Sequence, residues 1–202
     1  MYPELIRYKE YISTVPVSGQ IILAHQREEH LLVYQAYNHA IANFAVKHQY
    51  LGGSHFKYSR MSWIKPNFLW MMFRCGWAAK ENQERVLGLW IKKSDFNKIL
   101  EEAVYSSYQE DIYNSREAWQ KELEQKEVRL QWDPDHDLFG NKVERRAIQL
   151  GLKGQILESF GKEMISEIVD MTEIVKEQKQ RIDQGEQEMI LVPKEWELIR
   201  KS

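Results

Sequence analysis

Residues 56–77 read FKYSRMSWIKPNFLWMMFRCGW and form the most distinctive stretch of this 202-residue chain. The stretch holds three of the seven tryptophans, Trp63, Trp70 and Trp77. Pro66 suits the first position of a helix, because its φ is already helical and its missing N–H is not needed there. Gly76 is the kind of residue that ends a helix. We therefore predict an extended segment over residues 56–63, followed by a helix from Pro66 to Gly76.

Three cations, Arg60, Lys65 and Arg74, are set among these apolar residues. Arginine and lysine are seldom embedded in apolar sequence without a partner. The start of a helix also presents unpaired backbone N–H groups, which suit an anion when cations lie nearby. The tryptophans and methionines are expected to form core. For the cations, a ligand contact and a structural role are both open.

Charge is distributed unevenly along the chain. Residues 31–80 contain no Asp or Glu, although the whole chain has 30 and a net charge of −2. The same span carries six lysines and arginines and three histidines, so the remainder is acidic, with 28 − 6 = 22 basic against 30 acidic residues. Positive charge concentrated in one span favours an anionic small molecule, a nucleotide or a nucleic-acid backbone as partner.

Length and composition predict a single domain over residues 1–202, with residues 1–17 as an N-terminal arm. Hydrophobic residues make up 43% of the chain, which is enough for a real core. The single cysteine, Cys75, excludes an internal disulfide and a cysteine metal site. No apolar run is long enough to span a membrane and the N-terminus lacks a signal-peptide pattern. We expect a cytoplasmic protein without a membrane partner, and the oligomeric state is open.

Hydrophobic patterning predicts an α+β domain with a mixed or antiparallel split sheet and flanking helices. Strand patterns lie at residues 20–24, 31–37, 85–91, 128–132, 146–152 and 189–192, and helical patterns follow Asn38 and cover residues 96–104 and the second part of 105–126. Residues 154–183 predict one long amphipathic helix packed on the domain. Its apolar stripe at three- and four-residue spacing consists of Leu157, Phe160, Met164, Ile168, Met171 and Val175.

Standard catalytic and metal-binding motifs are missing from the sequence. Asp133, Asp135, His136 and Asp137 lie close enough in sequence to hold a divalent cation, but a solvated turn is the preferred interpretation and no metal is expected. Cys75 is interpreted as an inert core thiol.

Three polar residues interrupt hydrophobic strands: Gln35 in VYQAY, Ser62 in RMSW and Gln149 in RAIQLGL. A buried polar side chain needs a hydrogen-bond partner, because leaving it unpaired costs free energy. Two hypotheses are open: the three side chains make structural hydrogen bonds, or they converge on a ligand in a cleft between strands.

Four sequence blocks carry a resemblance to a known family: VYQAYNHAIANFAV, FKYSRMSWIKPNFLWMMFRCGW, QWDP and RAIQLGL. They resemble a widespread family of intracellular proteins defined only as a domain of unknown function. The resemblance covers most of residues 5–160, and it implies no particular activity.

The order of elements is similar to that of the ADP-ribosyltransferase fold, which holds NAD in a cleft between split mixed sheets. Enzymes of that fold use a His or Arg from a first strand, a Ser or Tyr from a second and often a later Glu. On this pattern Gln35 takes the first position, Ser62 the second, and Gln149 or Glu144 the third. The chain departs from the pattern, since VYQAY has no His or Arg and RAIQLGL has no Glu.

The leading hypothesis is a nucleotide-binding, ADP-ribosyltransferase-like enzyme acting on NAD or on a phosphorylated or nucleic-acid substrate. Arg60 and Lys65 are expected to grip a pyrophosphate, Trp63 to stack on a ring, and Ser62 with Gln35 to hold the ribose or amide. The further site candidates are Tyr34 and Arg74 for binding and Glu144 and Gln149 for catalysis. Glu144 is the candidate for stabilising a cation-like ribose.

Two alternatives belong to other classes of protein. One is a non-catalytic module for RNA or single-stranded nucleic acid, which would use the basic span and its aromatic residues. The other is an interaction protein whose helix over residues 154–183 pairs with a partner or with itself.

Overall fold

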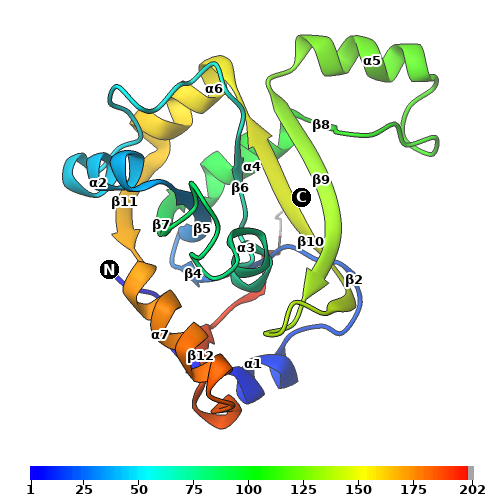
Figure 1. Cartoon of the computed structure of the whole chain (residues 1–202). Coiled ribbons are helices and arrows are strands. Elements are labelled where there is room, and N and C mark those ends of the chain that lie inside the picture. Colours follow the sequence, from blue (N-terminus) through cyan, green and yellow to red (C-terminus); the bar gives the residue numbers. More distant parts are fainter. Residues whose placement is uncertain (200–202) are drawn as a thin grey trace.

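A computed structural model describes residues 1–199 and shows an α+β architecture with several sheets (Figure 1). The first large sheet is antiparallel and has the strand order β11-β7-β5-β4. Its strands are β4 (Gln26–Arg27), β5 (His30–Tyr37), β7 (Arg85–Lys92) and β11 (Ile165–Asp170). The strands predicted at residues 31–37 and 85–91 are thereby confirmed.

β5 lies between two hydrophobic clusters because successive side chains of a strand point to opposite faces. Leu31 and Val33 belong to one cluster, and Leu32 and Tyr34 belong to the other. All four side chains are fully buried. This double burial explains why the segment reads as a continuous apolar run rather than as an alternating pattern.

The second large sheet is mixed. It consists of β2 (Gly19–Gln20), β6 (Ser62–Ile64), β8 (Ala103–Tyr105), β9 (Val128–His136) and β10 (Lys142–Leu152). β10 pairs antiparallel with β9 and β6 and parallel with β2, while β8 runs parallel to β9. β9 and β10 bend together, so that the sheet curls like half of a barrel (Figure 1). The α+β class and a mixed sheet, as predicted, are confirmed.

The two sheets meet at Tyr34 and Lys65. Tyr34 N donates to Lys65 O at 2.7 Å, and Lys65 N donates to Tyr34 O at 3.2 Å. This junction fixes the end of β6 against the middle of β5.

Helix α3 (Phe68–Cys75) confirms the helix predicted in the tryptophan-rich stretch, although it begins two residues after Pro66. It packs against β5 and β9. The side chain of Asn67 caps it by accepting a hydrogen bond from Trp70 N at 2.7 Å. Gly76 ends it with a φ of 57°, a conformation that glycine adopts at little cost.

The single long helix predicted over residues 154–183 is wrong. The segment forms α6 (Gly154–Ser159), a π-helical turn (Phe160–Met164), strand β11 and α7 (Thr172–Asp183). β11 pairs with β7, so its backbone groups form hydrogen bonds with that strand of the antiparallel sheet instead of continuing a helix. The hypothesis of an interaction protein built on that long helix loses its basis.

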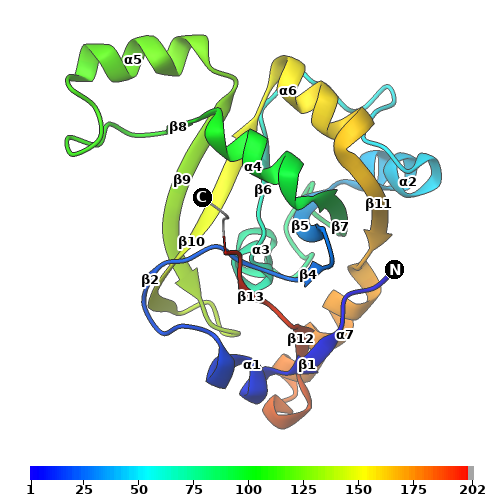
Figure 2. The same ribbon diagram turned by 180° about the vertical axis from the view of Figure 1, so that it is seen from behind.

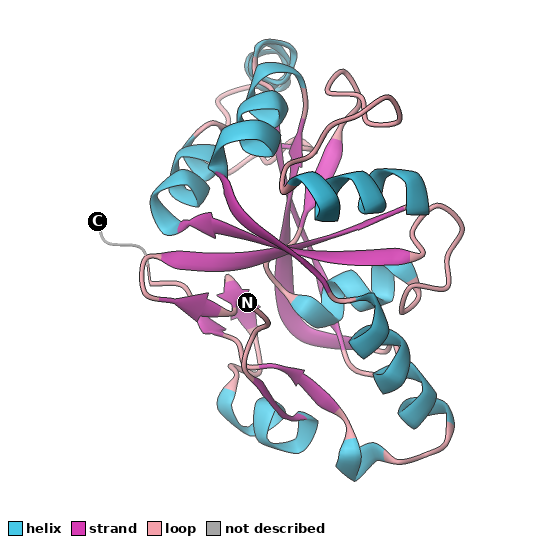
Figure 3. Ribbon diagram, turned by 90° about the vertical axis from the view of Figure 1, so that its left-hand side faces the viewer, coloured by secondary structure: helices cyan, strands magenta, loops and turns pink. Residues whose placement is uncertain are grey.

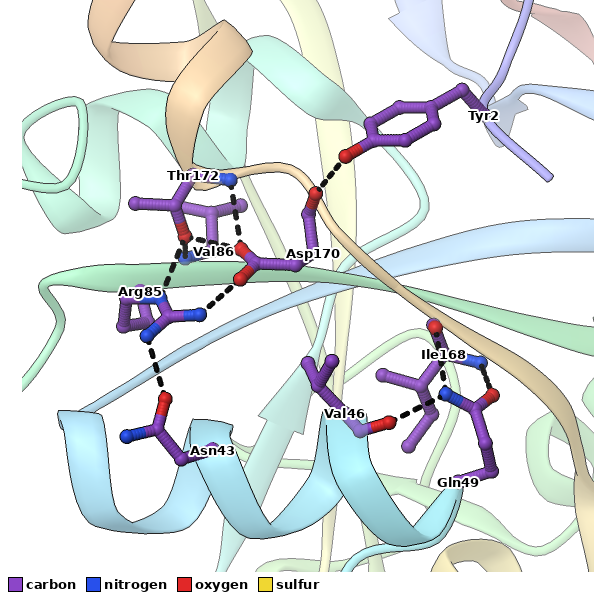
Figure 4. A network of polar contacts seen from close by, with 9 residues as sticks. All are labelled: Tyr2, Asn43, Val46, Gln49, Arg85, Val86, Ile168, Asp170 and Thr172. Atoms are coloured by element: carbon purple, nitrogen blue, oxygen red, sulfur yellow. Dashed lines mark hydrogen bonds and ion pairs between the residues drawn. The ribbon is translucent and has the colours of Figure 1, made fainter.

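Side-chain hydrogen bonds fix this strand and its connections (Figure 4). The amide of Gln49 pairs with the backbone of Ile168, accepting from its N–H at 2.8 Å and donating to its carbonyl at 3.2 Å. Asp170 accepts hydrogen bonds from Thr172 and forms an ion pair with Arg85. The Gln49 side chain thus covers part of the free edge of β11, where a further strand would otherwise pair.

Segments near the two ends of the chain pair with each other, at the lower edge of the molecule and on the side that faces the viewer in Figure 2. β1 (Leu5–Arg7) pairs with β12 (Leu191–Pro193), and β3 (Leu23–Ala24) pairs with β13 (Trp196–Glu197). Part of the predicted N-terminal arm is therefore a strand of a small sheet. The strand predicted at residues 20–24 is divided between β2 and β3, which belong to different sheets.

The remaining helices lie around the strands (Figure 3). They are α1 (Tyr8–Thr14), α2 (His39–His48), α4 (Lys93–Glu101), α5 (Arg116–Gln125) and a 3₁₀ turn (Gln187–Met189). α5 projects from the body of the protein (Figure 1) and has no buried residue. Within residues 1–199, no helix combines the length and the apolar character needed to cross a bilayer.

Candidate functional site

A cavity of about 810 Å³ opens beside the junction of the two sheets. β5 and β6 contribute to its wall together with the loop before β6, helix α3, and strands β9 and β10. Its size is in the range of small-molecule sites. The tryptophan-rich stretch supplies the largest share of the lining, because that stretch crosses from one sheet to the other.

Seven of the nine site residues expected from the sequence line this cavity. They are Gln35, Arg60, Ser62, Trp63, Lys65, Arg74 and Gln149. Tyr34 and Glu144 do not line it. Tyr34 is the neighbour of Gln35 on β5 and therefore faces the opposite side, where its ring packs edge-on against Phe68. Glu144 is exposed near the start of β10, ahead of the point where β10 becomes buried.

Part of the cavity wall is a chain of buried, neutral polar groups. Gln35 Nε2 donates to Ser62 Oγ at 2.7 Å, and the Tyr37 hydroxyl lies 3.0 Å from the same oxygen. Burial raises the pKa of Tyr37 far above its usual value, so this hydroxyl keeps its proton. Gln35 Oε1 is buried and accepts no hydrogen bond from any described residue. A buried acceptor without a partner is rare, and Gln35 is one of the residues that line the cavity.

A carboxylate forms a second polar group in the wall. Asp133 accepts hydrogen bonds from Gln149 Nε2 at 2.7 Å and from Gln131 Nε2 at 2.8 Å, and all three residues line the cavity. Gln131 and Gln149 face each other across the β9–β10 pair. The sequence interpretation had assigned Asp133 to a turn. The two-residue spacing of Gln131 and Asp133, which places both on one face of a strand, was the available signal.

Part of the cavity lining is basic and exposed. Arg60, Arg74 and Lys57 are exposed cations in this lining, and His55 is also exposed there. Within residues 1–199, neither Arg60 nor Arg74 forms an ion pair with a carboxylate. Both arginines, which the sequence offers as binding candidates, thus lie in the lining of a cavity.

Lys65 differs from these cations because its side chain is only 5% exposed. Its Nζ donates a hydrogen bond to Trp63 O at 3.0 Å. Burial, and to a lesser extent the nearby charge of Arg74, lower the pKa of Lys65 to about 7. Near neutral pH Lys65 is therefore charged in only part of the molecules, and the expectation that it grips a pyrophosphate stays a prediction.

The start of α3 is also unavailable to an anion, contrary to the sequence expectation. Phe68 N donates to Glu195 Oε1 at 2.7 Å, and Asn67 accepts the hydrogen bond from Trp70 N. Glu195 is only 2% exposed. A carboxyl group of the protein thus occupies the place that was predicted for a phosphate, and an anion in the cavity depends on side-chain cations.

The remaining polar candidates have structural contacts. Asp135 is fully buried and forms an ion pair with Arg145, whose Nη2 lies 2.6 Å from Asp135 Oδ2. Asp137 accepts hydrogen bonds from Phe139 N and from Asn141, which close the turn after β9. Cys75 is buried, and burial raises the pKa of its thiol.

No curated protein matches the chain. A family model described as a domain of unknown function (DUF4291) matches residues 21–198, a range that includes every cavity residue. The chain therefore belongs to the DUF4291 family.

Proposed function

We propose that the cavity binds a nucleotide and that the protein is an enzyme of the ADP-ribosyltransferase type acting on NAD or a related phosphorylated substrate. One observation carries the proposal. Gln35, whose buried Oε1 accepts no hydrogen bond from a described residue, lines the same cavity as Arg60 and Arg74, which are exposed and form no ion pair with a described carboxylate. Buried polar groups and exposed cations in one lining suit a molecule with a hydrogen-bonding head and a phosphate-bearing body.

Each part of NAD has a matching group in the cavity. The carboxamide N–H groups of nicotinamide are donors that suit the free Gln35 Oε1, and the ribose hydroxyls suit Ser62 and Tyr37. Arginines bind phosphates well because their planar guanidinium donates paired hydrogen bonds. Trp63 is half-buried in the lining and offers a face for stacking.

Asp133 takes the role that the sequence hypothesis gave to Glu144. Cleavage of the N-glycosidic bond sends the bonding electron pair to nicotinamide and leaves a cation-like ribose. A carboxylate held in place beside that carbon stabilises the positive charge without rearranging. Asp133 is held by two amide donors in the cavity wall, whereas Glu144 is exposed outside it.

Nucleotide binding is tested by the thermal unfolding of the full chain. We expect millimolar NAD, ADP-ribose or ADP to raise the melting temperature, because a ligand that binds only the folded state stabilises it. Arg60→Ala and Arg74→Ala should each weaken binding about tenfold, since a hydrogen bond to a charged group contributes roughly 1.5–3 kcal/mol. Arg116→Ala is the control, because Arg116 is exposed on α5 and is absent from the lining.

A second measurement separates an enzyme from a binding module. Release of nicotinamide from NAD should be measurable with the unaltered chain and fall about a hundredfold in Asp133→Asn, while binding is retained. Unchanged melting temperatures with all three nucleotides would refute the nucleotide site.

Single-stranded nucleic acid is a second candidate ligand, because Lys57, Arg60 and Arg74 are exposed beside the half-buried Trp63. Binding of this kind weakens steeply as salt increases, since phosphate contacts release counterions. Strong oligonucleotide binding at low salt, together with no response to NAD, would favour this candidate over the first.

A further inference from the structure

Lys65 is an amine in an unusual place. Its backbone is fixed by the junction with Tyr34, and its side chain reaches the cavity with little exposure to solvent. The Nζ group makes one hydrogen bond, to Trp63 O, and has no carboxylate within ion-pair distance among the described residues. An ammonium has three N–H groups to satisfy, so the charged form of Lys65 is poorly accommodated.

The groups that face Lys65 from neighbouring elements favour its neutral form on balance. Arg74 from α3 disfavours a second positive charge, and burial acts in the same direction. Asp133 from β9 and Cys75 from α3 act in the opposite direction and are weaker. With a pKa of about 7, a large fraction of Lys65 carries a free lone pair at neutral pH, whereas a lysine of ordinary pKa does so in roughly one molecule in 2,500.

We propose that Lys65 Nζ forms an imine with the aldehyde group of a phosphorylated aldehyde or sugar bound in the cavity. A neutral amine in a protected pocket is the arrangement that lysines use to attack carbonyl compounds. The same molecule is expected to carry a phosphate, because the exposed Arg60 and Arg74 in the lining can donate paired hydrogen bonds to one. This inference does not depend on the nucleotide proposal, although the open-chain form of ADP-ribose is one compound of this class.

The reaction is balanced without an oxidant or reductant. The Nζ lone pair adds to the aldehyde carbon, the C=O π pair moves to oxygen, and that oxygen takes a proton released by nitrogen. The nitrogen lone pair then forms the C=N bond while the hydroxyl leaves as water with the second nitrogen proton. The neutral imine then takes a proton from solvent water, and the charge of Asp133 in the cavity wall favours this protonated, positively charged form.

Reductive trapping in the full chain tests the proposal. The protein is incubated at pH 7 with ribose 5-phosphate, ADP-ribose or ribose in the presence of sodium cyanoborohydride. Hydride transfer to the C=N carbon converts an imine to a stable secondary amine, which peptide mass spectrometry then locates. We expect occupancy at Lys65 to exceed that at Lys57 by about tenfold or more, because the neutral fraction of Lys65 is large. Ribose, which lacks a phosphate, should label it much less.

Lys57 is the matched control, because it lines the same cavity but is exposed to solvent. Lys121→Met, on α5 and outside the lining, should leave trapping at Lys65 unchanged, and Lys65→Met should abolish the adduct at this position. Labelling spread equally over exposed lysines, or an adduct that persists in Lys65→Met, would overturn the proposal. The ratio of adduct occupancy at Lys65 to that at Lys57 in the unaltered chain tests the proposal even if Lys65→Met fails to fold.

The three probes also separate this inference from the nucleotide proposal. Trapping of ribose 5-phosphate without any response of the melting temperature to NAD supports the amine chemistry alone. A response to NAD without trapping of either phosphate compound supports the nucleotide site and refutes the imine. Trapping of ADP-ribose but not ribose 5-phosphate shows that the aldehyde must come from a nucleotide.

Discussion

Glu195 is a buried carboxylate whose direct partners are neutral groups. It accepts hydrogen bonds from Phe68 N, from the Tyr11 hydroxyl at 3.1 Å and from Asn67 Nδ2 at 3.1 Å. Burial raises its pKa to about 8, the charge of Asp135 adds to this, and the hydrogen bonds oppose it. In the unfolded chain a glutamate titrates near 4.3. Between these two values the folded protein holds a proton that the unfolded chain has released.

This difference predicts that Glu195 lowers the free energy of unfolding as pH rises from about 4.3 to about 8. Three other groups raise the free energy of unfolding as pH rises, because burial lowers their pKa. His25 and His136 do so below pH 6.5, and Lys65 does so above pH 7. The difference between the unaltered chain and Glu195→Gln isolates the glutamate. We expect urea unfolding to show that, between pH 5 and pH 8, the free energy of unfolding of the unaltered chain falls by about 3.5 kcal/mol relative to that of Glu195→Gln. A constant difference would contradict the assignment.

Individual cavity residues could be predicted from the sequence where a polar side chain interrupts an apolar strand. Gln35, Ser62 and Gln149 were identified in this way, because burying such groups demands a partner. Asp133 was missed because it precedes a proline and looks like a turn residue. Glu144 was chosen only from the resemblance to the ADP-ribosyltransferase pattern, and the structure places it, exposed, near the start of β10 and outside the cavity lining.

At the scale of elements, α3 was predictable because its ends carry local signals, whereas the segment after Gly154 was not. The spacing of Phe160, Met164 and Ile168 fits one helical face, but Ile165–Asp170 also fits a strand with β-branched residues. Pairing with β7 decides between them, and that pairing joins residues far apart in the sequence. In this segment the pairing with β7 determines the structure, and the helical spacing of the apolar residues does not.

The cap of α3 provides a test at this scale. Asn67→Ala removes the acceptor for Trp70 N and a donor to the buried Glu195. We expect the free energy of unfolding to fall by about 2 kcal/mol or more, measured in urea. Ser115→Ala removes an equivalent cap, the acceptor for Ala118 N, from α5, which has no buried residue. Its cost should stay below about 1 kcal/mol, because an exposed helix frays locally; equal costs for the two caps would contradict the central role of α3.

At the scale of the whole molecule, the closure of the chain on itself was not predictable. Leu5 lies opposite Pro193 in the β1–β12 pair, and Ala24 lies opposite Trp196 in the β3–β13 pair. Strands of two or three residues carry no periodic pattern long enough to recognise. The same C-terminal segment delivers Glu195 to the start of α3 and so connects the ends of the chain to the wall of the cavity.

Removal of this segment should therefore affect the whole fold and not only the terminus. A chain that ends at Met189 lacks β12, β13 and Glu195, and leaves β1, β3 and the first N–H of α3 without partners. We expect it to lose the cooperative urea transition and the near-ultraviolet circular dichroism of packed aromatic residues. The control replaces residues 109–121, which include the first part of the projecting helix α5, by a short Gly-Ser linker. That replacement should preserve cooperative unfolding, because α5 contributes no buried residue. A shortened chain that unfolds as cooperatively as the control would show that the cavity is built without its C-terminal support.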